Sequence, residues 1–323
     1  MMAALRNDDA IEIASRWITA SNLPYSAALI SGSAAQASPK APYDPASDVD
    51  CYLVVDGDPP DGKIGKATVD GVLLDVSWLP WQQLESTETN AVFASLIHFG
   101  RIVRDSDGRL VDLKERIDAG FESPDAIAAR LEDMRGRIRS IAQWGTQAQL
   151  PQPEQVMNWI FPATLATHIP LIKACAPLTV RKRFVAAKRV MGAHEYEQML
   201  ALFGFDSVTA EQAQSWLDDT ATLFEHTGPL ATDSDRFWAS DIQEGARAIS
   251  IGGSQKLIDE GFHREALYWI VATRARCLTV MHDVGADTTF YMPAFEDMTN
   301  TLGVATEEQR AIRSANILEW IEN

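Results

Sequence analysis

The chain is organised around the stretch Ser47-Asp48-Val49-Asp50-Cys51-Tyr52, which sets two carboxylates two residues apart at the head of an apolar run. The run predicts a strand over residues 48–55, and because side chains alternate along a strand, Asp48 and Asp50 leave the same face. Their Cα atoms are then roughly 6–7 Å apart. Two carboxylate groups on one face of a strand repel each other. The repulsion is about 4 kcal/mol when the charges are roughly 4 Å apart and the effective dielectric constant is near 20. The pair needs a compensating charge, and a divalent cation supplies it most simply.

Two further segments place polar residues within or just after apolar strands. Ile30-Ser31-Gly32-Ser33 ends a strand predicted over residues 25–31, and the Gly32 backbone and Ser33 hydroxyl suit a phosphate tail, since glycine lets other groups approach closely. Leu73-Leu74-Asp75-Val76 sets a third acid inside a strand. Each segment alone has a simpler explanation, a turn or a solvated strand face. The combination is more informative than its parts.

The first 120 residues alternate helical and strand patterns. An apolar stripe predicts a helix that is capped by Asn7 or Asp8 and runs to Ser21. Asp70-Gly71, between residues 66–69 and 72–79, predicts a two-residue hairpin that holds Asp75 in its second arm. The small-residue, Pro-rich passage that follows Gly32-Ser33 and runs to Ser47 is predicted to be a loop. Further elements are predicted over residues 81–85, 90–99 and 110–119 (helices) and 101–104 (strand).

Beyond a linker at residues 120–124 the pattern is almost wholly helical. Pro162 and Pro170 are expected to kink or split the second helix of this part. No repeat of fixed period is present, which favours a bundle over a solenoid. The helices are predicted over residues 125–149, 154–175, 180–190, 194–203, 210–226, 235–251, 257–284 and 307–321. The predicted fold is therefore an N-terminal α/β (α+β) domain with a mixed β-sheet over residues 1–120, followed by an all-α helical bundle domain over residues 121–323.

Composition and charge narrow the classes of function. The formal net charge is −17 at pH 7, and acidic residues outnumber basic ones on both sides of Gly120. A basic footprint for nucleic acid is missing, so we expect a cationic or neutral small molecule and no nucleic acid as partner. The three cysteines form no C-x-x-C pair, and no apolar run has the length of a membrane span or signal core. We expect a cytoplasmic monomer or homodimer without membrane contact.

Taken together, the three segments resemble the nucleotidyltransferase superfamily typified by DNA polymerase beta and kanamycin nucleotidyltransferase. That pattern is Gly followed by Gly or Ser after a hydrophobic strand, two acids separated by a hydrophobic residue, and a third acid between hydrophobic residues. Gly32-Ser33, Asp48-Val49-Asp50-Cys51 and Leu74-Asp75-Val76 match it. The resemblance covers residues 10–118, and the strand at residues 100–105 looks like the element that closes the domain in antibiotic-modifying members.

The resemblance implies a Mg²⁺-dependent nucleotidyltransferase. Asp48, Asp50 and Asp75 would be the catalytic carboxylates and the ligands of one or two Mg²⁺ ions, with Asp75 acting as a metal ligand, a general base, or both. Gly32 and Ser33 would bind the terminal phosphates of ATP or another nucleoside triphosphate. A hydroxyl of a small molecule, such as an aminoglycoside-like antibiotic, would attack the α-phosphorus and release pyrophosphate. The helical domain would help to bind this acceptor.

The helical half adds one candidate site residue. Lys188 belongs to the densest basic cluster, where the simpler interpretation is a solvated helix face and the sharper one is contact with the triphosphate. The members of the basic cluster are Arg181, Lys182, Arg183, Lys188 and Arg189. The pair Tyr268-Trp269 is interpreted as core packing rather than as a shelf for a nucleobase. The segment at residues 57–64 is rejected as a phosphate-binding P-loop because Pro59 and Pro60 lack N–H donors.

Two other functions stay open. One is a non-catalytic, nucleotide-binding regulatory or antitoxin-like module whose helical part pairs with another protein. ATP binding without turnover, together with a stable protein partner, would favour it. The other is a protein adenylyltransferase that modifies a Tyr, Ser or Thr of a partner. Transfer of label from ATP to protein would separate it from the small-molecule enzyme.

Overall fold

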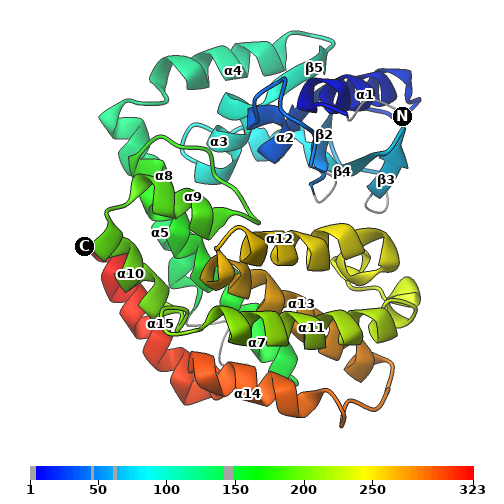
Figure 1. The fold of residues 1–323 in the computed structure, drawn as a ribbon. Coiled ribbons are helices and arrows are strands. Elements are labelled where there is room, and N and C mark those ends of the chain that lie inside the picture. The colour runs from blue at the N-terminus through cyan, green and yellow to red at the C-terminus, as the bar shows by residue number, and fades with distance from the viewer. Residues whose placement is uncertain (1–4, 45–46, 61–63, 142–147) are drawn as a thin grey trace. The chain divides into compact units, whose positions relative to one another are not determined.

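The computed structural model describes residues 5–44, 47–60, 64–141 and 148–323. The chain forms two compact units (Figure 1), one made of Met1–Asp133 with Cys175–Thr179 and the other of Met134–Ala174 with Val180–Asn323. This division falls later in the chain than the predicted boundary at Gly120. Parts of three predicted elements lie outside the described residues: the loop at residues 45–46, the rejected P-loop at residues 61–63 and the helix end at residues 142–147.

The first unit is built on a five-stranded mixed sheet, as predicted. Its order is β3-β4-β2-β1-β5, in which β2 and β4 are parallel and the other neighbouring pairs are antiparallel. The strands are β1 (Ala27–Ser31), β2 (Val49–Val55), β3 (Gly65–Val69), β4 (Val72–Pro80) and β5 (Arg101–Asp105). The strand predicted to start at Asp48 therefore begins one residue later, and Asp48 leads directly into it.

The hairpin of β3 and β4 has the geometry that its sequence predicts. Asp70 and Gly71 both adopt left-handed backbone conformations, with φ of 48° and 81°. A two-residue turn with both φ values positive suits the right-handed twist of the paired strands, and Asp-Gly is one of the few pairs that adopt it readily. Val69 pairs with Val72, so the register counts outward from the turn and sets Lys66 opposite Asp75.

Helices cover both faces of the sheet, because alternate strand residues are buried on opposite sides. On one face Val49, Cys51 and Leu53 pack in a core shared with α1. On the other face Leu29, Val54 and neighbouring apolar residues pack with α3 and α4. The helices of this unit are α1 (Asn7–Ala20), α2 (Gly32–Gln36), α3 (Ala91–Phe99), α4 (Arg109–Gly120) and α5 (Pro124–Arg139), with a 3₁₀ turn, η1, at Trp81–Leu84.

Two local predictions for this unit are wrong. The N-cap of α1 is Arg6 rather than Asn7 or Asp8, and the Arg6 backbone N–H donates to Asp9 Oδ2 at 2.8 Å. The passage after Gly32 begins with the helix α2 instead of a loop. Its small residues Ala34 and Ala35 are 4% and 7% exposed and pack in the core beneath α1. Tertiary burial therefore outweighs the loop-like composition of the segment.

The second unit consists of helices packed around α13, whose residues are buried along most of its length. Helices α7, α11 and α12 contact it, and Figure 1 shows α11 and α12 running beside it. The helices are α7 (Gln152–Ala163), α8 (His168–Lys173), α9 (Arg183–Val190), α10 (Ala193–Leu202), α11 (Ala210–Thr227), α12 (Gly253–Asp259), α13 (His263–Asp283), α14 (Met292–Leu302) and α15 (Glu307–Glu322).

The predicted split of residues 154–175 occurs, since the 3₁₀ turn Thr164–Thr167 separates α7 from α8. The helix predicted over residues 257–284 is broken at Gly261, whose φ of +83° ends α12. Residues 235–251 form short 3₁₀ and π-helical turns instead of an α-helix. Helix α14 was not predicted, because Pro293 suggests a break although it lies in the first turn, where proline is tolerated. No helix in the described part of the chain is long and apolar enough to cross a membrane.

Candidate functional site

The strand register brings two of the three predicted acids side by side. Asp50 on β2 lies opposite Asp75 on the parallel strand β4. The same line continues to Lys66 on β3 and to Ser31 on β1. Because directly opposite residues of neighbouring strands share a face, these four side chains form one row across four strands. We call Lys66, Asp75, Asp50 and Ser31 the polar row.

Lys66 supplies the cation that the acids need in this structure. Its Nζ lies 2.9 Å from Asp48 Oδ2 and 3.5 Å from Asp75 Oδ2, so one ammonium group bridges two of the three carboxylates. The Lys66 side chain is 13% exposed, against 23% for Asp48 and 19% for Asp75. Sequence reasoning missed this residue. The hairpin register, counted back from Asp70-Gly71, was the signal that pairs it with Asp75.

Gly32 is required by its contact with Asp50. A Cβ atom at this position would lie 1.8 Å from Asp50 Oδ2 and 2.9 Å from its Cγ. The backbone φ of +76° is also one that residues with side chains rarely adopt. The carboxylate of Asp50 therefore packs directly on the Gly32 backbone, and the two predicted segments meet in space.

Ser33 is the residue after Gly32, and its side chain is exposed in the first turn of α2. Its Oγ lies 2.8 Å from Ser47 Oγ, which belongs to the residue just before Asp48. This contact joins the two ends of the long passage between Gly32-Ser33 and the acids. The structure thus brings together Gly32, Ser33 and the three acids, all within the first unit.

The groups around the acids are held neutral. Burial, followed by the negative charge of Asp50, raises the pKa of the Cys51 thiol to about 12. Burial and Asp50 likewise raise the pKa of Tyr52. Burial is the main cause that raises the pKa of Tyr43 to about 12, with a smaller contribution from Asp48, and its hydroxyl donates to the Ser47 carbonyl at 2.6 Å. These neighbours add no positive charge, so the compensating cation comes from Lys66 or from a bound ion.

The donor set suits a hard cation. Among the described residues, no group of three or more His, Cys, Asp or Glu side chains is arranged to enclose a metal ion. Mg²⁺, however, is usually bound by one or two carboxylates together with substrate phosphates, rather than by a cage made only of protein. Asp48 and Asp75 already share one cation through Lys66. Two carboxylates that share a cation are the kind of protein ligands that Mg²⁺ uses when phosphates supply the rest.

Lys188 lies in the second unit and forms an ion pair there. Its Nζ lies 3.1 Å from Oε1 of Glu265, a carboxylate whose side chain is 2% exposed. Tyr196 donates a second hydrogen bond to the same oxygen at 2.8 Å. A buried carboxylate needs such partners, so this contact has a structural explanation. The predicted role of Lys188 in phosphate binding stays a prediction.

Tyr268 and Trp269 are 0% and 7% exposed, which confirms that they pack in a core.

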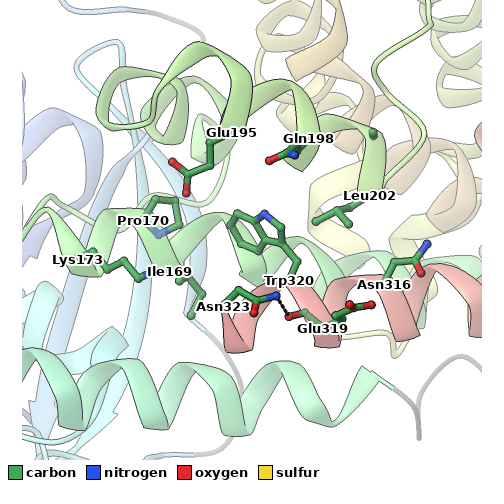
Figure 2. Close-up of a pocket in the computed structure, with 11 residues that line it drawn as sticks. Ile169, Pro170, Lys173, Glu195, Gln198, Leu202, Asn316, Glu319, Trp320 and Asn323 are labelled. Carbon is green, nitrogen blue, oxygen red and sulfur yellow. Dashed lines mark hydrogen bonds between the residues drawn. The ribbon is translucent and has the colours of Figure 1, made fainter.

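A pocket of about 630 Å³ in the second unit lies among α8, α10 and α15 (Figure 2). Trp320 points into it from α15, toward Gln198 on α10. Two carboxylates, Glu195 and Glu319, stand at its wall together with amide side chains. None of its residues belongs to the predicted site. Because three helices that are distant in sequence contribute to it, no local motif signals this pocket.

A scan against protein-family models finds no match for this chain, and a search of curated proteins finds none either. The candidate site is therefore argued from its residues and their geometry.

Proposed function

We propose that the chain is a Mg²⁺-dependent nucleotidyltransferase that transfers AMP from ATP to a hydroxyl group of a small molecule and releases pyrophosphate. One observation carries the proposal. Asp50 and Asp75 lie in register on neighbouring parallel strands, Asp48 precedes the first of these strands and shares Lys66 with Asp75, and Asp50 lies against the Gly32 backbone. This is the constellation that phosphoryl-group chemistry needs, since such chemistry depends on positioning and on neutralising charge.

Each site residue has a role that follows from its position. Asp48 and Asp50 would hold Mg²⁺, and Asp75, opposite Asp50 in the sheet, would complete the ion's ligands or take the proton of the acceptor hydroxyl. Bound Mg²⁺ would stabilise negative charge on the reacting phosphate oxygens. Because Gly32 has no side chain, the carboxylate of Asp50 lies directly against its backbone, and an ion held by Asp50 would lie near the start of α2. The exposed Ser33 hydroxyl would donate to the same phosphates.

Lys66 is the internal counterion of the site. While no metal is bound, its ammonium group neutralises part of the charge of Asp48 and Asp75 and keeps both carboxylates oriented. A divalent ion carries twice this charge and binds two carboxylates more strongly. A metal held by Asp48 and Asp75 would take over their charge from Lys66, and the long side chain of Lys66 would then reach toward the phosphates.

The acceptor class follows from charge. The chain carries a formal net charge of −17, so its field attracts cationic molecules. A polyhydroxylated amine, such as an aminoglycoside-like antibiotic, offers both this charge and the hydroxyl groups that the reaction needs.

The experiment incubates the protein with Mg²⁺, ATP and a panel of polyhydroxylated amines and measures pyrophosphate release. We expect release that depends on both the metal and the acceptor, and that is lost when Asp48→Asn and Asp50→Asn are combined. The control is Asp56→Asn, which makes the same change at a 58% exposed acid. Release that persists in the double variant contradicts the proposal. ATP binding without turnover on any acceptor favours the non-catalytic module, and label found on protein favours the protein adenylyltransferase.

A further inference from the structure

Arg276 of α13 is enclosed by aromatic rings in the second unit. Its Cζ lies 4.8 Å from the ring centre of Phe161, 5.5 Å from that of Trp238 and 5.6 Å from that of Trp269. The residue is only 6% exposed. A guanidinium group over ring faces gains cation–π attraction, which is stronger away from water. The rings therefore hold the charged group in place but neutralise none of its charge.

Two more arginines meet the same set of rings. Arg181 Cζ lies 4.4 Å from the ring centre of Trp269, and Arg183 Cζ lies 4.5 Å from that of Tyr268. Tyr268 and Trp269 are themselves in contact, with ring centres 5.0 Å apart. We call the following residues the arginine cluster: Arg181, Arg183, Arg276, Phe161, Trp238, Tyr268 and Trp269.

Carboxylates compensate only part of the buried positive charge. Arg276 donates to Asp241 Oδ2 at 3.0 Å. Arg183, which is 3% exposed, donates to the hydroxyl of Thr164 and the carbonyl of Val180, and it has no ion pair within the described residues. Burial lowers the pKa of both Arg183 and Arg276, as expected where desolvation exceeds the compensation. In a strongly acidic chain this is a local excess of positive charge.

Two buried donors of the arginine cluster also lack an acceptor. Trp269 Nε1 and Arg276 Nε are enclosed and have no hydrogen-bond partner among the residues that the structure describes. A buried donor without an acceptor is costly, so native proteins keep few of them. Here the two donors belong to side chains that contact each other. The missing partner is therefore an acceptor, and the charge around it calls for an anion.

The arginine cluster has a partly open side. Phe161 and Arg181 are half-buried, and the Asp241 side chain is 28% exposed. Arg181 lies across Gly253, where a Cβ atom would come within 3.2 Å of its guanidinium nitrogen. Arg181 is therefore a member of the arginine cluster that lies at its partly exposed side.

We propose that the arginine cluster is a binding site for a phosphate-type oxyanion, held by the guanidinium groups of Arg181 and Arg276 and by the indole N–H of Trp269. Arginine matches phosphate because its planar fork makes two parallel hydrogen bonds to neighbouring oxygens. A tetrahedral phosphate also presents oxygens in the several directions from which these donors come, whereas a carboxylate presents two oxygens in one plane. All members of this site belong to the second unit, and it requires no metal.

The test is calorimetric titration of the full-length protein with inorganic phosphate, pyrophosphate and ATP, each with EDTA to remove divalent ions. We expect at least one of them to bind. We expect Arg181→Met to weaken binding by about tenfold or more, as the loss of a charge-assisted contact does. Trp269→Phe keeps an aromatic ring but removes the indole N–H, and we expect the binding affinity to fall several-fold. Arg181→Lys keeps the positive charge but not the planar guanidinium group, so we expect its binding affinity to lie between those of the wild type and Arg181→Met.

The matched control is Arg247→Met. Arg247 is 38% exposed and pairs with Glu225 in the same unit, so the variant removes the same charge away from the arginine cluster. Binding is expected to stay at the wild-type value. Equal losses in Arg247→Met and Arg181→Met would mean attraction by overall charge and would overturn the proposal. Two further results would overturn it: no binding of any of the three phosphates, or binding unaffected by both Arg181→Met and Trp269→Phe.

The outcome is independent of the proposed transferase activity. The double variant Asp48→Asn with Asp50→Asn is expected to bind phosphate under EDTA like the wild type, because its changes lie in the first unit. Loss of metal-free binding in that variant would contradict a separate site. Lack of pyrophosphate release in the wild type would contradict the transferase and leave the binding result as it stands. Arg276→Met is avoided because its burial makes misfolding the expected result.

Discussion

The sheet of the first unit and the arginine cluster of the second each bring like charges close together, negative charges on the sheet and positive charges in the cluster. On the sheet, Asp48 and Asp75 share Lys66, whereas in the cluster a buried Arg276 has one carboxylate partner and Arg183 has none within the described residues. The aspartates are held by strand register and remain 19–23% exposed where they meet Lys66. The two buried arginines are held by rings and are 3–6% exposed. The two regions therefore favour ligands of opposite charge, a cation on the sheet and an anion at the rings.

The largest expected effect is that of Asp50→Asn on activity. An amide keeps the shape but not the charge, so we expect pyrophosphate release to fall by about 1,000-fold or more. The melting temperature should stay the same or rise, because one of three like charges is removed. Asp70→Asn, on the exposed hairpin turn, is the control for both measurements. Equal activity in the two variants would mean that the acids of the sheet are only structural.

Gly32→Ala is expected to cost the first unit about 3 kcal/mol or more. The new Cβ atom collides with the Asp50 carboxylate and the backbone is left-handed, so two penalties combine. Gly57→Ala is the matched variant, since Gly57 has φ of +84° but nothing within 4 Å of its Cβ position. We expect it to cost about 1 kcal/mol from backbone strain alone. Urea unfolding measures both, and equal costs would show that the contact with Asp50 is unimportant.

Removing a cation should have unequal effects in the two regions. Lys66→Met leaves Asp48 and Asp75 without their shared partner, and we expect a loss of about 1–3 kcal/mol that millimolar Mg²⁺ reverses. Arg181→Met keeps an apolar side chain on Trp269 and removes one of three neighbouring positive charges, so we expect a loss below about 1 kcal/mol that Mg²⁺ does not change. Thermal melts with and without Mg²⁺ measure the difference. A Lys66→Met variant that Mg²⁺ does not stabilise would contradict a metal site at these acids.

The smallest expected effect concerns the cysteines. Burial raises the pKa of Cys51 and of Cys277 to about 12, whereas Cys175 is half-buried. We therefore expect one thiol to react with a chromogenic thiol reagent at pH 8 in the folded protein, and three after unfolding. The neutral buried thiols contribute stability that is complete below their usual pKa of 9.0 and is lost as pH rises toward 12. A Cys51→Ala variant should lose less stability over this range than the wild type.

Several elements could be predicted because their signals are local. Asp70-Gly71 specifies its own turn, and Asn90 caps α3 by accepting from the N–H groups of Val92 and Phe93. Local composition misleads where burial decides, as in α2, whose alanines pack beneath α1. It also misleads in α14, because Pro293 is a helix breaker everywhere except in the first turn that it occupies.

Local sequence is enough to place Asp48 and Asp50 on one face of a strand and Asp75 in a hairpin arm, and the same turn implies its pairing with Lys66, which we recognised only in the structure. These facts follow from the two-residue period of a strand and from a turn of fixed length. Only the tertiary structure decided that β2 runs parallel to β4, which places Asp50 beside Asp75, and that the Gly32 backbone lies against Asp50. It alone also gathered the arginine cluster from segments far apart in the chain. Such neighbours come together because apolar faces are buried against each other. The sequence pattern of an element predicts which face is buried, but it does not identify the element that covers this face.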